Sequence, residues 1–222
     1  MNGFYLRFAA AWLVSVGVGC TSAPVRYYTL TAPPDKTLPA SQTTLTIDVR
    51  VVHVPPQLNR AELMVRTGPT EVTLLENERW ASPVRDEIKD ALRLELQRRL
   101  DRMSGLLPAF AKLTLDIDVQ HLEAEFGQYA LIEASWSATL SAAGERSATG
   151  QPSNDARVRT CTFQADEKID AGYAGIVEGY QREIAALADA IVAVLTSPAN
   201  GIDAPCQKAI EGSAGGSAPK DH

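Results

Sequence analysis

The chain has 222 residues, of which 45% are hydrophobic and 22% charged, as in an ordinary globular protein of one domain or two small ones. Its formal net charge is −6, and because binding to nucleic-acid phosphates needs a basic face, we expect no nucleic-acid partner. The three histidines, His53, His121 and His222, are scattered and give no metal-ligand spacing. We therefore expect no metal site and no cofactor.

Residues 1–19 have the layout of a secretory signal peptide. A single cation, Arg7, precedes an apolar run over residues 8–16, and small residues follow. The run is shorter than the roughly 20 apolar residues that a membrane-spanning helix needs. The small residues end at Cys20, and this arrangement resembles the lipobox of bacterial lipoproteins, although Gly17 stands where that family usually has Leu. The alternative is an ordinary signal peptide cut elsewhere.

The lipobox resemblance implies that the mature protein begins at Cys20 and that this cysteine carries acyl chains such as palmitate. Each buried methylene contributes about 0.8 kcal/mol, so two or three chains anchor a protein firmly. The next residue is Thr21, whereas Asp at this position retains enterobacterial lipoproteins in the inner membrane. The resemblance therefore implies an anchor on the periplasmic face of the outer membrane.

The first half of the chain predicts three strands after a tether. Residues 20–43 contain four prolines that keep the chain extended, and an aromatic and β-branched stretch at 27–30 predicts one short strand there. Residues 45–51 alternate between apolar and polar side chains, the period of a half-buried strand. Further strands at 62–66 and 71–75 flank a Gly-Pro turn signal, which predicts a hairpin.

A helix is predicted from Ser82-Pro83 onward. Ser82 is the expected N-cap, and Pro83 suits the first helical position. The positive end of the helix dipole favours the acidic residues in the first turn. Apolar residues recur every four positions from Val84 to Leu100, and Gly105 is the expected end.

Three strands and a second helix are predicted in the second half. Apolar residues alternate over 113–119 and 130–140. The phase slips by one near His121, which predicts a β-bulge there, and Phe126 is expected on the apolar face after the slip. A strand over 157–163 and a helix from near Ala171 to Leu195 complete the pattern, with Pro198 ending the helix.

The order of strands, helix, strands and helix predicts an α+β fold. We expect a two-layer sandwich, in which two long helices cover one face of a mainly antiparallel sheet. The predicted organisation is a signal peptide at 1–19, a lipidated tether at 20–43, one domain at 44–197 and a flexible tail at 198–222.

Few residues suggest chemistry. Asp116 and Asp118 share one strand face, as the carboxylates of a glycosidase do; the alternative is the solvated face of an amphipathic strand. No Gly-x-Ser-x-Gly and no phosphate-binding loop is present in the sequence. Cys161 and Cys206 are either a disulfide or two buried thiols. The sequence therefore predicts no enzyme.

With these residues in place, the chain resembles the PqiC/YmbA family of auxiliary lipoproteins. The resemblance runs from Tyr27 to about Leu195, and its carriers include the Leu58-Asn59-Arg60 segment and the Glu-Arg-Trp-Ala-Ser-Pro-Val stretch at 78–84. The family commonly has Asp at Asn59 and an acid at Ser82. The resemblance implies a non-enzymatic role beside MCE-domain proteins and a transporter permease, which together move lipid between the two membranes. An assembly of several copies stays open.

A contact surface for such a partner is expected near Arg60, Arg66, Arg79 and Trp80, because Trp and Arg are enriched at binding hot spots. In the alternative, Trp80 packs the start of the helix against the core and the arginines pair with nearby acids. A different function also stays open, namely a structural envelope lipoprotein that binds a secretin, pilus or peptidoglycan component.

Overall fold

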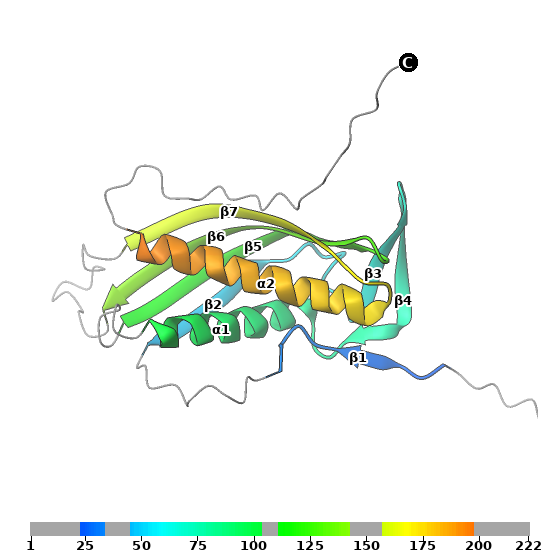
Figure 1. Ribbon diagram of the computed structural model, residues 1–222, viewed down its shortest axis with the longest axis horizontal. Coiled ribbons are helices and arrows are strands. Elements are labelled where there is room, and N and C mark those ends of the chain that lie inside the picture. The colour runs from blue at the N-terminus through cyan, green and yellow to red at the C-terminus, as the bar shows by residue number, and fades with distance from the viewer. Residues whose placement is uncertain (1–22, 34–44, 104–110, 143–156, 198–222) are drawn as a thin grey trace, which may run out of the picture.

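The computed structural model describes residues 23–33, 45–103, 111–142 and 157–197 (Figure 1). These residues form seven strands and two helices: β1 (Arg26–Tyr28), β2 (Thr46–His53), β3 (Glu62–Gly68), β4 (Glu71–Trp80), α1 (Val84–Arg102), β5 (Ala111–Glu125), β6 (Tyr129–Ala142), β7 (Arg157–Lys168) and α2 (Tyr173–Thr196). The predicted signal peptide, Cys20, Gly105, Pro198 and Cys206 lie outside the described residues.

All seven strands belong to one open sheet, in the order β1-β4-β3-β5-β6-β7, with β2 also paired to β5. The long β5–β6 and β6–β7 ladders and the β3–β4 hairpin are antiparallel. The edge of β5 opposite β6 pairs with two strands in turn. β2 pairs in parallel with residues 112–118, and β3 pairs in parallel with Glu125. β1 adds a short parallel pairing to the end of β4. The α+β fold is therefore confirmed, with a mixed sheet.

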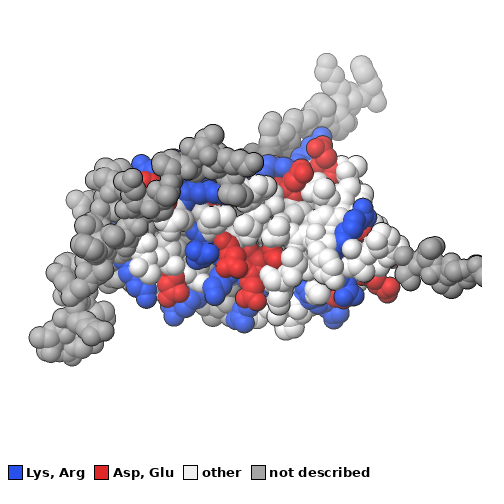
Figure 2. Space-filling model, turned by 90° about the horizontal axis from the view of Figure 1, so that it is seen from below, with Lys and Arg blue, Asp and Glu red and all other residues white. Residues whose placement is uncertain are grey.

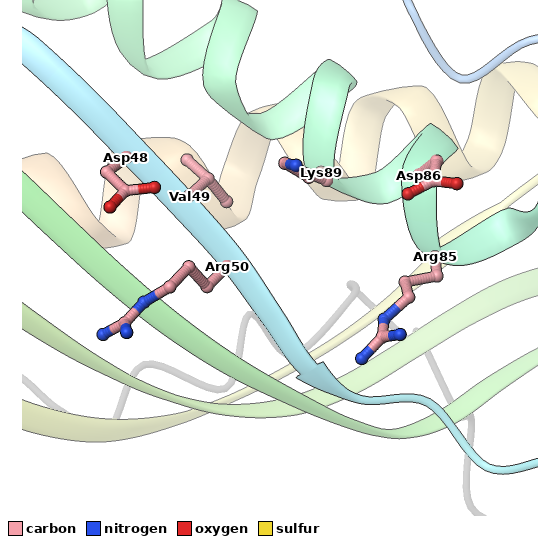
Figure 3. Close-up of a pocket in the computed structure, with 6 residues that line it drawn as sticks. All are labelled: Asp48, Val49, Arg50, Arg85, Asp86 and Lys89. Carbon is pink, nitrogen blue, oxygen red and sulfur yellow. The ribbon is translucent and has the colours of Figure 1, made fainter.

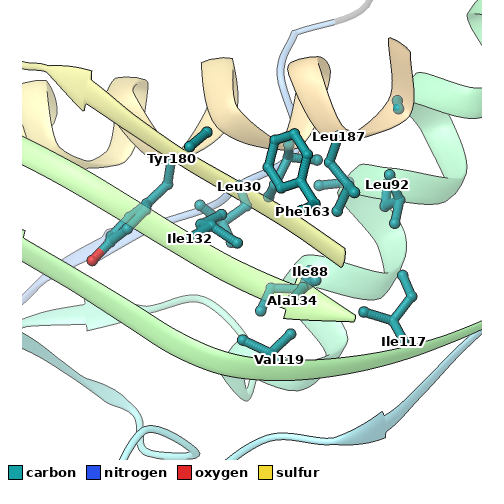
Figure 4. Packing of buried hydrophobic residues seen from close by; sticks show 14 of the residues in the cluster. Leu30, Ile88, Leu92, Ile117, Val119, Ile132, Ala134, Phe163, Tyr180 and Leu187 are labelled. Atoms are coloured by element: carbon teal, nitrogen blue, oxygen red, sulfur yellow. The ribbon is translucent and has the colours of Figure 1, made fainter. Parts of the chain in front are cut away.

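Both helices cover the same face of the sheet (Figure 1). The apolar stripe of α1 is buried along its whole length, and so is most of the stripe of α2. On the sheet, the alternating apolar residues of β5 and β6 point toward the helices (Figure 4). Aliphatic side chains that alternate along a strand and recur every three to four positions along a helix thus meet in one core.

Helix α2 lies unusually close to the sheet at Gly179. A Cβ atom at this position would come within 2.9 Å of the Cβ of Ala130 on β6 and would also meet Ile169. Since real Cβ atoms do not approach so closely, only glycine at this position allows α2 to pack directly against β6.

The register of β5 and β6 shifts between Val119 and His121, so the predicted bulge is confirmed. The hairpin is also confirmed, although β4 and β7 continue five residues beyond the predicted ends, to Trp80 and Lys168. The first strand is Arg26–Tyr28 rather than 27–30.

Two local expectations were wrong. Ser82 does not cap α1: the N-cap residue is Pro83, which makes no side-chain cap hydrogen bond, and the Ser82 hydroxyl instead donates to Glu87. Phe126 does not extend the apolar face of β5, because the strand ends at Glu125 and Phe126 lies exposed in the turn before β6.

Candidate functional site

Two buried glutamates hold the N-terminal segment against the domain. Glu78 on β4 accepts a hydrogen bond from the Tyr28 hydroxyl at 2.7 Å and a forked ion pair from the Arg26 guanidinium, whose Nε lies 3.0 Å from both carboxylate oxygens. Burial raises the pKa of Glu78, but the hydrogen bonds from Arg26 and Tyr28 outweigh it, so the pKa lies below its usual value.

Glu87 on α1 makes the second connection. Its Oε2 accepts from the Thr29 hydroxyl at 2.7 Å and the Leu30 amide at 2.9 Å, and its Oε1 accepts from the Ser82 hydroxyl at 2.7 Å and the Ser82 amide at 3.0 Å. One carboxylate therefore joins the segment after β1 to the start of α1. We call the contacts of Glu78 and Glu87 the N-terminal clasp.

The arginines expected at a contact surface differ in how far they are engaged. Arg66 on β3 forms a forked pair with Glu123, and its Nη1 also donates to the carbonyl of Pro69 at 3.1 Å. The Tyr129 hydroxyl donates to the same glutamate at 2.6 Å. The hydrogen bond from Arg66 is the main reason that the pKa of Glu123 lies below its usual value. Arg66 thus stabilises the hairpin against β5.

The remaining expected contact residues lie at the end of β4 and in the loop before β3. Arg79 pairs with Glu62 at 3.2 Å and is partly exposed, and Arg60 is exposed and forms no ion pair with another described residue. Trp80 is only 5% exposed, and its ring lies 6.3 Å from that of Tyr180 on α2. This position matches the alternative in which Trp80 packs the start of α1 against the core. Whether the arginines bind a partner stays a prediction.

The outer face of the sheet carries the two aspartates that were considered as a catalytic pair. Asp116 is paired with Arg50 of β2 at 2.7 Å. Asp118 borders a shallow hollow of about 190 Å³ with Ser135, Ser137 and Thr160. Among the described residues no cluster of histidine, cysteine and carboxylate side chains is suited to hold a metal ion.

A larger polar groove of about 270 Å³ lies between β2 and the first turns of α1. Figure 3 shows Arg50 reaching out from β2 and Arg85, Asp86 and Lys89 lying on the facing helix. Seen from the α1 side, acidic and basic side chains are interspersed (Figure 2), so this face has no extended patch of one sign.

Comparison with known families decides what kind of protein this is. The family model described as the ABC-type transport auxiliary lipoprotein component matches residues 28–192. The chain belongs to this family. The resemblance predicted from the sequence is thereby confirmed, and the matched region begins at the last residue of β1 and ends within α2.

Among the solved structures, the first described here supports the fold, and the fold alone. One crystal structure of an uncharacterized protein is 20% identical to this auxiliary lipoprotein and has a TM-score of 0.52, with 76% of this chain and 97% of that chain covered. Protein XCC0632 from Xanthomonas campestris is 18% identical with a TM-score of 0.45, over 75% of this chain and 92% of that chain. No curated protein matches the chain.

The family is one of transport components and not of enzymes. Neither described helix is apolar over enough of its length to cross a bilayer. Cys161 is buried on β7 and is disulfide-bonded. Its expected partner, Cys206, lies outside the described residues, and the pairing of these two cysteines stays a prediction.

The N-terminal clasp is the part of the site that sequence reasoning missed. Glu87 was expected to act only on the helix dipole, and Glu78 was considered only as a partner of nearby arginines. The sequence did contain a signal for Glu87. It lies three positions after Val84 and so shares the buried face of α1, where a carboxylate needs hydrogen-bond partners.

Proposed function

We propose that this protein is an auxiliary lipoprotein that is anchored in the outer membrane by acyl chains on Cys20. There it docks the end of an MCE-type tunnel, in a lipid transport system that also contains a permease. The observation that carries the proposal is the family match over residues 28–192 behind a lipobox-like Gly-Val-Gly-Cys sequence. The periplasmic domain performs no chemical step.

The hollows of the domain favour docking over carrying lipid. The groove beside β2 is open and lined by charged side chains, and a second hollow, next to Trp80 and Tyr180, holds only about 20 Å³. Sites that enclose a small ligand are mostly apolar and have volumes of about 300–1,000 Å³. The two hollows therefore offer no enclosed apolar space for a phospholipid among the described residues, which supports binding of another protein through the surface.

The anchor is tested first. Because the acyl chains provide the membrane affinity, Cys20→Ser should release the protein from membranes or leave an uncut precursor. Membrane fractionation and intact mass measure this. An unacylated N-terminus on the mature wild-type protein would contradict the anchor.

The partner is tested by affinity purification of the detergent-solubilised lipoprotein after mild cross-linking in cells. We expect an MCE-domain protein and a permease to be recovered by mass spectrometry. Recovery of a secretin, a pilus protein or peptidoglycan fragments in their place would support the structural envelope function instead.

The contact surface is tested with Arg60→Ala, since Arg60 is exposed and supports no ion pair with a described residue. If Arg60 belongs to a binding hot spot, the affinity for the MCE partner should fall by about 2 kcal/mol at an unchanged melting temperature. Arg93→Ala, at an exposed position of α1, is the matched control. Equal affinity of both variants would remove Arg60 from the surface.

A further inference from the structure

The large hydrophobic side chains that stay exposed are gathered at one end of the molecule. Among the described residues they are Val25, Tyr27, Val72, Leu74 and Phe126. They come from β1 and the residue before it, from β4, and from the turn between β5 and β6, and these three segments lie at the same end of the sheet (Figure 1). Single exposed hydrophobic residues are normal on a protein surface, but a group at one end indicates contact with an apolar partner.

Aromatic rings are clustered at this end. The Phe126 ring meets the Tyr173 ring edge to face, with centroids 5.1 Å apart, and the Arg26 guanidinium lies 5.3 Å from the centre of the Tyr173 ring. Tyr27, the next residue along β1, is 66% exposed. The β5–β6 turn and the start of α2 thus bring two aromatic rings together beside Arg26 of β1. Because successive side chains of a strand point to opposite faces, Tyr27 projects from the other face of the same strand. We call these four residues the aromatic end.

The position of Phe126 is held by the turn that follows it. Gly127 has a φ of +67°, and a Cβ there would lie 3.6 Å from the Cα of Ala171. The Ile169 amide donates to the carbonyl of Gln128 at 3.2 Å, which fastens the turn to the segment before α2. Phe126 is therefore held in place on the surface by the backbone around it.

The chain leads from the aromatic end directly to Cys20. Val25 lies five positions after Cys20, and five positions of fully extended chain span at most about 18 Å. The far end of the domain lies about 36 Å away along the 24-residue helix α2. An acyl anchor on Cys20 therefore brings the aromatic end, and not the far end, within reach of the bilayer.

We propose that the aromatic end rests in the headgroup region of the membrane that holds Cys20 and so fixes the orientation of the domain on that membrane. This proposal rests on the acyl anchor of the proposed function. Aromatic side chains favour the boundary between headgroups and acyl chains, where Phe126 and the ring of Tyr27 leave water while the Tyr27 hydroxyl stays hydrated. Arg26 is neutralised by Glu78, so the contact does not depend on anionic lipid.

The contact can be measured with a tryptophan placed at the aromatic end. The mature chain has two tryptophans, Trp80 and Trp136, and both are buried. In Phe126→Trp, the added emission should be lost when the full-length lipoprotein is reconstituted into phosphatidylcholine vesicles that contain brominated acyl chains. Tyr27→Trp provides a second, independent position. Ala193→Trp, at an exposed site near the far end of α2, is the matched control and should keep its emission.

The outcomes separate the contact from the anchor. Intact mass of the vesicle-bound protein reports acylation of Cys20, and quenching reports the contact. Strong quenching at positions 126 and 27 with none at 193 supports the proposal. Equal quenching at all three positions of an acylated protein overturns it, and so does the absence of quenching.

If Cys20 is not acylated, the anchor fails, and the contact is still measured. The mature Cys20→Ser chain is then held on vesicles through an N-terminal hexahistidine tag and a nickel-chelating lipid, with the same three tryptophan positions. Selective quenching at positions 126 and 27 supports the contact under these conditions as well, and its absence overturns it.

Discussion

Replacing Glu87 by Gln should destabilise the domain by about 3 kcal/mol, although the side chain keeps its size. The carboxylate accepts four hydrogen bonds, two from Thr29 and Leu30 and two from Ser82. A glutamine carbonyl can accept only two of them, and its amide group would face two donors. The hydroxyl groups can rotate, but the backbone amides cannot.

The magnitude follows from the bonds that are lost. A hydrogen bond to a charged group contributes about 1.5–3 kcal/mol, so the loss of two near the lower limit gives about 3 kcal/mol. Equilibrium unfolding in urea measures this. With a slope of about 2 kcal/mol per M, the midpoint should fall by about 1.5 M at an unchanged slope. Glu178→Gln, the same chemical change at an exposed site of α2, is the control. A midpoint shift no larger than that of the control would refute the clasp as a source of stability.

Glu183 of α2 is buried, and neither carboxylate oxygen meets a hydrogen-bond donor within the described part of the chain; burial raises its pKa from 4.5 to about 9. Between those values the unfolded chain is ionised and the folded chain is protonated at this site, so stability falls as pH rises, by at most about 4 kcal/mol from pH 5 to pH 8. Urea titrations at both pH values should show this decrease in the wild type and a smaller one in Glu183→Gln; identical decreases would count against it. Trp80→Ala should cost about 3–5 kcal/mol because it leaves a cavity beside α2, and a melting temperature near that of the wild type, combined with weaker partner binding, would return Trp80 to the contact surface. Labelling of the denatured, non-reduced mature protein should find Cys161 and Cys206 unreactive toward thiol reagents, whereas two reactive thiols would rule out the disulfide, which in the chain-entropy model contributes up to about 4 kcal/mol.

Periodicity was enough to predict the elements from the sequence, and it even located the bulge at His121, because one buried face constrains the register of a strand. Pairing between distant strands carries no such local signal. The parallel pairing of β2 with β5 joins Thr46 to Lys112, and the sequence of neither strand indicates the other as its partner.

The candidate site shows the same limit. Asp86 and Glu87 both lie in the first turn of α1, where the helix dipole favours acids. Only Glu87 is buried, because the segment around Leu30 packs over it and leaves Asp86 exposed. Ser82 is a residue type that often caps helices, but here its hydroxyl donates a hydrogen bond to Glu87 instead. For Trp80, residue type alone left both a surface role and a core role open, and only the packing of α2 distinguishes them.

The sharing of one edge of β5 by β2 and β3 has a consequence for how the chain folds. Arg50 and Asp116, which face each other across β2 and β5, are 66 positions apart, so β2 has no strand to join until the central third of the chain has formed. Until the residues of β5 have been synthesised, β2 is therefore an unpaired, partly apolar strand. We expect folding to be slow, with the β5–β6 hairpin formed first and β2 added only when its edge of β5 is available.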